Sequence, residues 1–358
     1  MSEMNVRTRI AVLFGGRSAE HDVSVMSATN VMAALDPAKY DAVPVFITRE
    51  GQWLLSRFDN GVLETPLFGT QIIFIPGGQG RIMALPVEGP ACEMEKIDIL
   101  FPVLHGLPGE DGAVQGLAEV AGVALAGCGI LGSATALDKV IAKRLFQAAG
   151  LPVARSITLN RGETPDFAAL VDRLGLPVFI KPARQGSSVG VSKVSGSQAF
   201  GPALLEGFRH DNALLAEEFV EGREIEFSLL EAVDGSLTVS RPGEITPAES
   251  HGFYSYDAKY IDAEGAALKV PADLAPQIEA EMRIAAENAF RALGCDGMAR
   301  VDFFLKADGR FVVNEVNTIP GFTSISMYPK ALEASGIRYG EIIDRLVAHG
   351  LMRKARMG

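Results

Sequence analysis

Near the C-terminal end of the chain, four polar side chains share one face of a predicted β-hairpin. The β-prone runs VDFFL and RFVVNEV flank an Asp-Gly pair at 308–309, the strongest short-range signal for a two-residue turn. With that turn, Asp302 faces Glu315, and Arg300 faces Asn317. Side chains alternate along a strand, so these four project together. The opposite face is expected to be packed, and it carries Val301, Phe303, Val312 and Val316.

The polar face of this hairpin has the donors that Mg²⁺ prefers. Like charges placed opposite each other destabilise a hairpin unless something neutralises them. Asp302, Glu315 and Asn317 supply hard oxygen ligands, too few to surround an ion unless a substrate phosphate adds more. A hairpin with ordinary solvated charges is the alternative. The segment NTIPGFT that follows favours the metal site, because a glycine-containing loop there can bring backbone amides to an anion.

A second stretch with phosphate-binding chemistry spans residues 177–191. The strand PVFIK ends at Lys181, and Gly-Ser-Ser-x-Gly follows at 186–190. Together they offer an ammonium group, the hydroxyls of Ser187 and Ser188, and free backbone N–H groups to a polyphosphate. No Gly-Lys-Ser/Thr begins a helix here, so this is not a Walker A loop. A flexible Gly/Ser hairpin is the alternative, and the adjacent lysine favours phosphate binding.

Two further loops follow runs that resemble buried parallel strands. Residues 9–14 lead into GGRSAEHD and then a helical pattern from 23 to 35, which places Glu20 at the carboxyl edge of a sheet, where open α/β folds bind ligands. Residues 97–103 lead into HGLPGEDG, which makes His105 a binding-loop candidate. A solvated loop and a structural histidine are the alternatives.

The middle of the chain supplies the elements that position these groups. Ser133 is expected to cap one helix that carries Lys139 in its second turn and ends at Gly150. Residues 214–227 predict two strands around a glycine turn, with acids that could meet adenine and ribose, although surface charge explains these acids equally well. Residues 243–265 have no regular period and hold three of the six tyrosines, as expected of a lid. Next come a long amphipathic helix over 273–293 and, after 326, two short helical patterns.

Composition limits the class of protein. With 358 residues, 48% hydrophobic and 22% charged, the chain is long enough for two or three globular domains. A net charge of −11 argues against sequence-independent nucleic-acid binding. Three widely spaced cysteines predict buried thiols in a reducing compartment. We recognise no signal peptide, and four glycines break the uncharged stretch 120–137, so no membrane span is expected.

In combination, these motifs resemble the D-alanine:D-alanine ligases of the ATP-grasp fold. The resemblance covers nearly the whole chain, and residues 50–95 resemble the long-form members. It rests on FGGRSAEHDVS (14–24), LHGLPGEDG (104–112), LDKVIAK (137–143), FIKPARQGSSVG (179–190), FYSYDAKY (253–260), ARVDFFL (299–305) and NEVNTIPGFTSIS (314–326).

The resemblance implies a multidomain α/β and α+β fold. A parallel α/β domain (1–135) would be followed by an ATP-grasp fold of two α+β subdomains, a small central one (136–240) and a C-terminal one (241–358) with the metal hairpin and the lid. ATP would phosphorylate one D-alanine, and the amine of a second would attack the acylphosphate, giving the dipeptide for peptidoglycan precursors. A cytoplasmic homodimer is expected, with no nucleic-acid or membrane partner.

The resemblance also implies roles for individual residues. Lys139 and Lys181 would hold the phosphates of the nucleotide, and Glu217 and Glu224 would lie at its adenine and ribose. The full set of nucleotide-binding residues would be Lys139, Lys181, Ser187, Ser188, Glu217, Glu218, Val220, Glu224 and Lys259. Two Mg²⁺ ions, with Mn²⁺ as a substitute, would bind Asp302, Glu315 and Asn317. Substrate binding and catalysis would use Glu20 at the first ammonium, His105 in the first pocket, Ser187 and Tyr260 as positioning groups, Arg300 and the backbone of Gly321 at the oxyanion, and Ser326 at the second carboxylate.

Three other functions compete with this interpretation. A ligase that takes D-lactate as second substrate is the nearest, and Tyr260 favours D-alanine because the resemblance places phenylalanine there in many depsipeptide-forming members. A dinucleotide-dependent oxidoreductase lacks its G-x-G-x-x-G fingerprint. A metal-dependent hydrolase would leave the Gly-Ser-Ser loop without a role.

Overall fold

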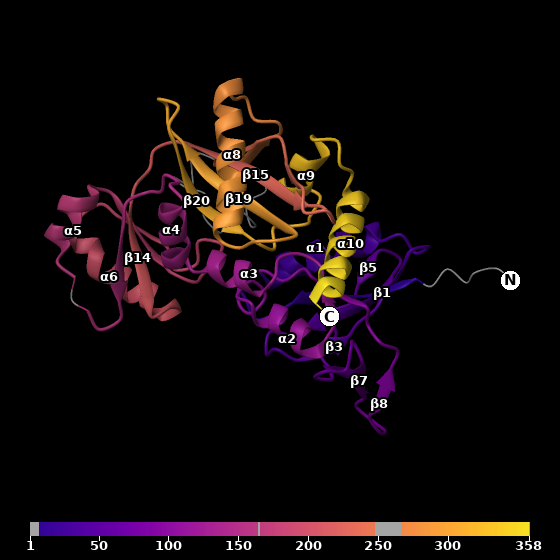
Figure 1. Cartoon of the computed structure of the whole chain (residues 1–358). Coiled ribbons are helices and arrows are strands. Elements are labelled where there is room, and N and C mark those ends of the chain that lie inside the picture. The colour runs from indigo at the N-terminus through magenta and orange to yellow at the C-terminus, as the bar shows by residue number, and fades with distance from the viewer. Residues whose placement is uncertain (1–6, 164, 248–265, 358) are drawn as a thin grey trace.

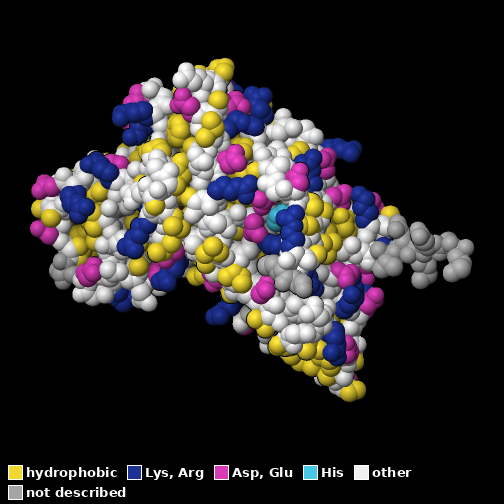
Figure 2. Space-filling model, viewed as in Figure 1, with side chains coloured by type: hydrophobic (Ala, Val, Ile, Leu, Met, Phe, Trp, Pro, Cys, Tyr) yellow, Lys and Arg dark blue, Asp and Glu magenta, His cyan; other side chains and the backbone are white. Residues whose placement is uncertain are grey.

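The computed structural model describes residues 7–163, 165–247 and 266–357. Three large sheets follow one another along the chain. The third, from the C-terminal part of the sequence, lies between the other two in space (Figure 1). The expected multidomain α/β and α+β architecture is confirmed. None of the described helices is long and apolar enough to cross a membrane. Charges of both signs are interspersed on the face shown in Figure 2, without the basic stripe expected of a nucleic-acid groove.

The N-terminal sheet has eight strands in the order β10-β9-β1-β2-β3-β6-β7-β8. Strand β1 pairs in parallel with β2 and β9. Beyond β2, the strands β3, β6, β7 and β8 extend the sheet with antiparallel pairing. The bounds are β1 Thr8–Gly15, β2 Tyr40–Ile47, β3 Trp53–Leu55, β6 Gln71–Phe74, β7 Ile82–Leu85, β8 Cys92–Met94, β9 Ile99–Pro102 and β10 Ala124–Leu125. A separate pair joins β4 Phe58–Asp59 to β5 Val62–Leu63.

Helices cover both faces of this sheet, which explains why β1 is a nearly unbroken apolar run. On one face, Ile10, Val12 and Phe14 pack with α1 (His21–Ala34) and α10 (Tyr339–Met357). On the other, Ala11 and Leu13 pack with α2 (Ala113–Ala121). Helix α10 is much longer than the short pattern expected there, and it joins the C-terminal end of the chain to the N-terminal sheet.

The central sheet is antiparallel, with the order β11-β14-β12-β13. Its bounds are β11 Ser156–Asn160, β12 Val178–Pro182, β13 Ser192–Val194 and β14 Ala213–Glu218. One face packs against α5 (Phe167–Leu174) and α6 (Ser197–His210) through Leu170, Leu174 and Phe200. The other face is therefore free to contribute side chains to a site.

The third sheet has the order β18-β17-β15-β19-β20, with β16 also paired to β15. Its bounds are β15 Arg223–Glu231, β16 Leu237–Val239, β17 Gly243–Pro247, β18 Ala266–Lys269, β19 Met298–Leu305 and β20 Phe311–Asn317. Helix α8 (Pro276–Ala292) packs Met282, Ala285 and Ala289 against it. Strands β15 and β16, which lie within the range 136–240 expected for the central subdomain, pair in this third sheet.

The expected helix capped by Ser133 is wrong, because two helices occupy this region. Helix α3 (Ile130–Leu137) has Ser133 buried inside it, and α4 (Lys139–Ala148) begins directly after Asp138. The carboxylate of Asp138 accepts hydrogen bonds from the N–H groups of Val140 at 3.0 Å and Ile141 at 3.1 Å. This cap stabilises a new helix start and makes Lys139 its first residue.

The β19–β20 hairpin has the expected pairing at its polar end but a different turn. The N–H of Lys306 donates to the carbonyl of Arg310 at 2.8 Å, so the loop is residues 307–309 and not the Asp-Gly pair alone. Gly309 has a φ of +83°, the left-handed conformation typical of a three-residue hairpin loop. The one-residue offset is removed at a β-bulge, where Asp302 pairs with Glu315 but Phe303 pairs with Val313.

The bulge also corrects the predicted packed face. Val301, Phe303 and Val316 lie in the core as expected, but Val313 lies there with them. Val312 instead packs in a separate small cluster. The extra residue, Asn314, lies beside Glu315 at the wall of the largest cavity described below.

Candidate active site

A cavity of 490 Å³ lies between the central sheet and the third sheet. This volume is in the range typical of sites for cofactors and drug-sized ligands. Apolar side chains from both sheets, including Phe179, Val220 and Phe304, provide surfaces against which a flat base could pack. Many of the predicted site residues line it, namely Lys139, Lys181, Ser187, Ser188, Glu217, Glu218, Val220, Glu224, Arg300, Asp302 and Glu315.

Two lysines hold one buried carboxylate at this cavity. Nζ of Lys181 lies 2.6 Å from Oε1 of Glu217, and Nζ of Lys143 lies 2.7 Å from Oε2. Burial would raise the pKa of Glu217, but the two ammonium groups outweigh it and lower that pKa to about 2. Glu217 thus neutralises the lysines, while its predicted adenine contact stays a prediction. The sequence patterns assign no role to Lys143, although it lies one helical turn beyond Lys139.

Lys139 contacts the residue that precedes the Gly-Ser-Ser segment at 186–188, which we call the phosphate-type loop. Its Nζ donates to the carbonyl of Gln185 at 2.6 Å, immediately before the Gly-Ser-Ser segment. Burial lowers the pKa of Lys139, and the neighbouring Lys181 adds to this effect, while Glu315 opposes it. Ser187 and Ser188 have φ values of +49° and +60°, a conformation that few residues other than glycine adopt. Successive residues in such a turn can direct backbone N–H groups toward an anion.

Arg300 organises the acidic wall of the cavity. Its guanidinium donates to both oxygens of Asp302, at 2.8 and 2.7 Å, and Nε lies 3.0 Å from Oε2 of Glu226 on β15. Burial would lower the pKa of Arg300, but these carboxylates raise it well above its usual range. Arg300 therefore stays charged beside the cavity, and Asp302 is fixed in position.

The polar face of the hairpin has a donor set that fits a hard divalent ion. Asp302 and Glu315 are direct cross-strand partners, and Nδ2 of Asn317 donates to Oδ2 of Asp302 at 2.9 Å. That bond leaves the amide oxygen of Asn317 as a ligand. Within the described ranges, no three His, Cys, Asp or Glu side chains group closely enough to hold a metal themselves. The set thus fits an ion that takes further oxygens from a phosphate.

Glu20 and His105 lie outside that cavity, where three loops converge. The carboxylate of Glu20 is buried, and its Oε2 would lie 3.3 Å from a Cβ built on Gly186 and 3.8 Å from one on Gly106. Nδ1 of His105 donates to the carbonyl of Ile319 at 3.0 Å. The loops after β1, β9 and β12 thus meet beside the segment that follows β20, and this junction brings together Glu20 and His105, the two residues expected at the first substrate.

His105 is held as a neutral hydrogen-bond acceptor. Burial lowers its pKa, although Glu20 opposes this, and its Nδ1 proton is used at the Ile319 carbonyl. Its buried Nε2 has no hydrogen-bond partner among the residues that the structure describes. A lone pair there can accept a proton donor from a substrate.

Glu110 is a residue of this junction that the sequence patterns do not single out. Its Oε2 accepts from the N–H of Gly106 at 2.7 Å, and its Oε1 accepts from the N–H of Ile319 at 3.2 Å. Burial, with help from Glu20, raises the pKa of Glu110 to about 8. It therefore ties the loop after β9 to the segment after β20, and no local pattern indicates that tie.

Gly321, expected at the oxyanion, and Ser326, expected at the second carboxylate, lie next to each other. A Cβ built on Gly321 would approach Oγ of Ser326 to 2.7 Å, so glycine is needed for this close contact. Oγ of Ser326 accepts a hydrogen bond from the N–H of Thr323 at 3.0 Å. Ser326 is the residue immediately before α9 (Met327–Glu333). Lys259 and Tyr260, with most of the expected lid, lie outside the described residues.

Comparisons with known proteins agree with this geometry. Two family models match, D-ala D-ala ligase N-terminus over residues 9–128 and D-ala D-ala ligase C-terminus over residues 145–348. The D-alanine--D-alanine ligase A of Brucella suis is 65% identical over 347 residues, which cover 97% of this chain and 98% of the relative.

Two solved structures place the fold in the same group. The VanG D-Ala:D-Ser ligase from Enterococcus faecalis aligns with a TM-score of 0.83 and 34% identity, over 96% of this chain and 99% of that one. The D-alanine--D-alanine ligase from Bacillus anthracis complexed with ATP aligns with a TM-score of 0.73 and 26% identity, over 98% of this chain and all (100%) of that one. From the family models and the high identity, this chain belongs to the D-alanine–D-alanine ligase family.

Proposed function

We infer that this protein is an ATP-dependent ligase that joins two D-alanine molecules into D-alanyl-D-alanine, releasing ADP and phosphate. One observation carries the inference: a nucleotide-sized cavity with lysines on one wall and Arg300, Asp302 and Glu315 on the other lies in a chain 65% identical to a D-alanine--D-alanine ligase. Joining a carboxylate to an amine needs activation of the carboxylate, and ATP supplies it through an acylphosphate.

The cavity supports phosphoryl transfer by positioning and charge. We assign Lys139 and Lys181 to the phosphates, since both lysines line the cavity together with the Gly-Ser-Ser loop and Nζ of Lys139 contacts the residue that precedes that loop. Arg300, held rigidly by Asp302 and Glu226, would stabilise charge that develops on the transferring group. Such transfer depends almost entirely on these two contributions.

We propose that Asp302, Glu315 and Asn317 hold Mg²⁺, two ions in the full site, with Mn²⁺ as a substitute. Bound there, the metal would neutralise phosphate oxygens that the lysines do not reach. The support is the donor set on one hairpin face.

The loops around Glu20 would hold the first D-alanine. The carboxylate of Glu20 suits the ammonium group, and Nε2 of His105 can accept a hydrogen bond from it. Gly186 brings the phosphate-type loop against Glu20, so the carboxylate of a bound D-alanine would lie near the transferred phosphate. Ser187 and Tyr260 are proposed to position this substrate.

The second D-alanine would meet the segment after β20. We propose that Ser326 binds its carboxylate and that the Gly321 backbone, with Arg300, stabilises the oxyanion formed when the amine attacks. Attack on the acyl carbon releases phosphate and leaves the peptide bond. Residues 243–265 are proposed as the lid that keeps water from the acylphosphate.

We further propose that the enzyme acts in the cytoplasm, where ATP is available, as a homodimer that supplies peptidoglycan precursors. The family membership supports this placement and role. Light scattering after size-exclusion chromatography tests the dimer, and a mass equal to one chain at working concentration would exclude it.

The activity is tested by measuring ADP release and identifying the product by mass spectrometry. We expect ADP release with ATP and D-alanine together, none with L-alanine, and D-alanyl-D-alanine as product. D-Lactate and D-serine, each added with D-alanine, test the second substrate. A dominant ester product at neutral pH would favour the depsipeptide ligase, and a dominant D-alanyl-D-serine product would favour the specificity named for the Enterococcus structure.

A further inference from the structure

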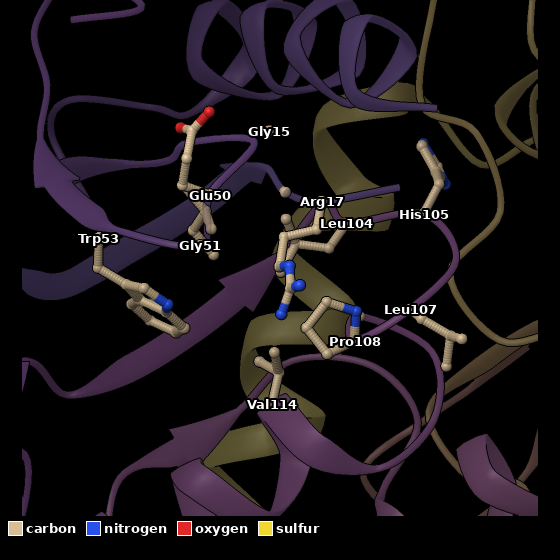
Figure 3. A pocket seen from close by; sticks show the side chains of 13 residues that line it. Gly15, Arg17, Glu50, Gly51, Trp53, Leu104, His105, Leu107, Pro108 and Val114 are labelled. Atoms are coloured by element: carbon tan, nitrogen blue, oxygen red, sulfur yellow. The ribbon is translucent and has the colours of Figure 1, made fainter. Parts of the chain in front are cut away.

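A second cavity, of 210 Å³, lies in the N-terminal sheet (Figure 3). It shares no lining residue with the nucleotide cavity. Its floor is formed where three parallel strands end, at Gly15 and Gly16 at the end of β1, Ile47 at the end of β2, and Leu104 after β9. In open α/β sheets, ligands bind just beyond the carboxyl ends of the strands. The favoured place is where the strand order reverses, so that the chain goes to one side of the sheet from one strand and to the other side from its neighbour. Strand β1, between β2 and β9, is such a place.

The glycine turn at the end of β1 lies close against β2. Gly15 has a φ of +89°, and a Cβ built on it would approach the carbonyl oxygen of Ile47 to 2.4 Å. The N–H of Gly16 donates to that same oxygen at 2.7 Å. The turn is therefore fixed against β2 and directs Arg17, the next residue, over the cavity.

Arg17 is the cation of this cavity. Its guanidinium lies among the lining side chains, toward Pro108 and Val114 (Figure 3). Its stem passes over Gly51, where a Cβ would lie 3.2 Å from Cδ of Arg17. No hydrogen bond or ion pair joins the Arg17 side chain to another residue in the described part of the chain. An arginine placed over an apolar hollow in this way is available to a carboxylate.

The remaining walls are apolar and include one aromatic ring. Trp53 is half-buried and directs its indole into the cavity, and Leu104, Pro108 and Val114 lie across from it. Glu50 and His105 also border the cavity, but both side chains point away from Arg17 (Figure 3). A ligand would thus meet one positive charge and a mainly apolar surface.

We propose that this cavity binds a small organic monocarboxylate with an aromatic or branched aliphatic body, the carboxylate at Arg17 and the body between Trp53 and Pro108. A guanidinium can bind a carboxylate through two parallel hydrogen bonds, which fixes the orientation of the ligand. The indole adds contact with the flat body. A zwitterionic amino acid fits less well, because among the described lining residues the acidic side chain, that of Glu50, points away from Arg17 and so offers no partner to an ammonium group inside the cavity.

Intrinsic fluorescence tests the proposal directly, since Trp53 is the single tryptophan of the chain. Phenylacetate serves as the carboxylate probe and phenylacetamide as its neutral counterpart, each titrated into the full-length protein without ATP or D-alanine. We expect a saturable change in Trp53 emission with phenylacetate and at least about tenfold weaker binding of phenylacetamide, because the charge-assisted bonds are lost.

Two arginine variants separate the cavity from general surface charge. Arg17→Ala should weaken phenylacetate binding at least about tenfold. Arg49→Ala is the matched control, because Arg49 is an exposed arginine of the adjacent β2–β3 turn that pairs with Asp22 and does not line the cavity. It should leave binding within about twofold. Circular dichroism confirms that both variants fold.

Three results would overturn the proposal: an emission change that stays linear in phenylacetate without saturating, equal binding of phenylacetamide, or unchanged binding in Arg17→Ala. Because the signal comes from Trp53 and needs no turnover, these results are independent of whether the ligase activity is found.

Discussion

Lys181 and Glu217 form an ion pair of 2.6 Å at the wall of the 490 Å³ cavity, and Lys143 takes the other carboxylate oxygen at 2.7 Å. Glu217 is 4% exposed and Lys143 is buried with it, while Lys181 is partly buried, so this group of charges has little contact with water. Two ammonium groups in such a place need a counterion in the empty enzyme. Glu217 supplies it, and the site can then hold positive charge ready for phosphates.

Replacing Glu217 with glutamine should destabilise the free enzyme. The change leaves two ammonium groups without their counterion, and breaking such a buried pair typically costs about 3–5 kcal/mol. Urea denaturation of Glu217→Gln measures the loss. The matched control is Glu218→Gln, whose partner Arg155 is exposed, and this loss should stay below about 1 kcal/mol. Equal losses in the two variants would contradict the role given to Glu217.

Replacing Glu315 with glutamine should nearly abolish turnover. The change removes a metal-ligand charge from the polar face of the hairpin and leaves its core packing intact, so we expect kcat to fall at least about a hundredfold with little change in thermal stability. ADP release at saturating Mg²⁺ measures the effect. Asp308→Asn, at the exposed turn of the same hairpin, should keep full activity. Wild-type turnover in Glu315→Gln would rule out the metal assignment.

The hairpin shows how far local sequence signals reach. The Asp-Gly pair predicts a turn at the right place, and the strand pattern predicts that Asp302 faces Glu315. The loop has one residue more than predicted, and the pairing is still correct because the bulge at Asn314 compensates. The bulge lets Val313 pack in the core with Phe303. Whether Val312 or Val313 packs in the core depends on tertiary contacts, and the alternation of side chains along a strand carries no information about these contacts.

The same limit explains the residues missed at the site. Motifs identify the groups that line the cavity, because glycine turns and strand ends are local features. Lys143 and Glu110 act through partners that are distant in sequence, Glu217 for one and Ile319 for the other. Their importance arises from burial beside those partners, and no spacing within the chain indicates it.

The helix cap at Asp138 should matter for ATP as well as for stability. Its carboxylate fixes the first turn of α4, where Lys139 begins the helix and reaches the Gln185 carbonyl. Asp138→Ala should cost about 1 kcal/mol of stability and raise the KM for ATP. Asp166→Ala is the control, because Asp166 caps α5 in the same way and does not line the cavity. For Asp166→Ala we expect a similar loss of stability with an unchanged KM for ATP. If the KM for ATP is unchanged in Asp138→Ala as well, the cap at Asp138 does not contribute to nucleotide binding.

Glu110 should make the folded enzyme less stable as pH rises. Burial raises its pKa from the ordinary 4.5 to about 8. Between these values the unfolded chain releases this proton while the folded chain keeps it, so the free energy of unfolding falls with increasing pH, by at most about 2 kcal/mol given the partial exposure of the side chain. Glu110→Gln removes this titration, so the stability of the wild type relative to the variant should decline from about pH 5 to about pH 8. Urea denaturation across that range measures the difference. Parallel profiles for the two proteins would mean that Glu110 is already ionised in the folded state.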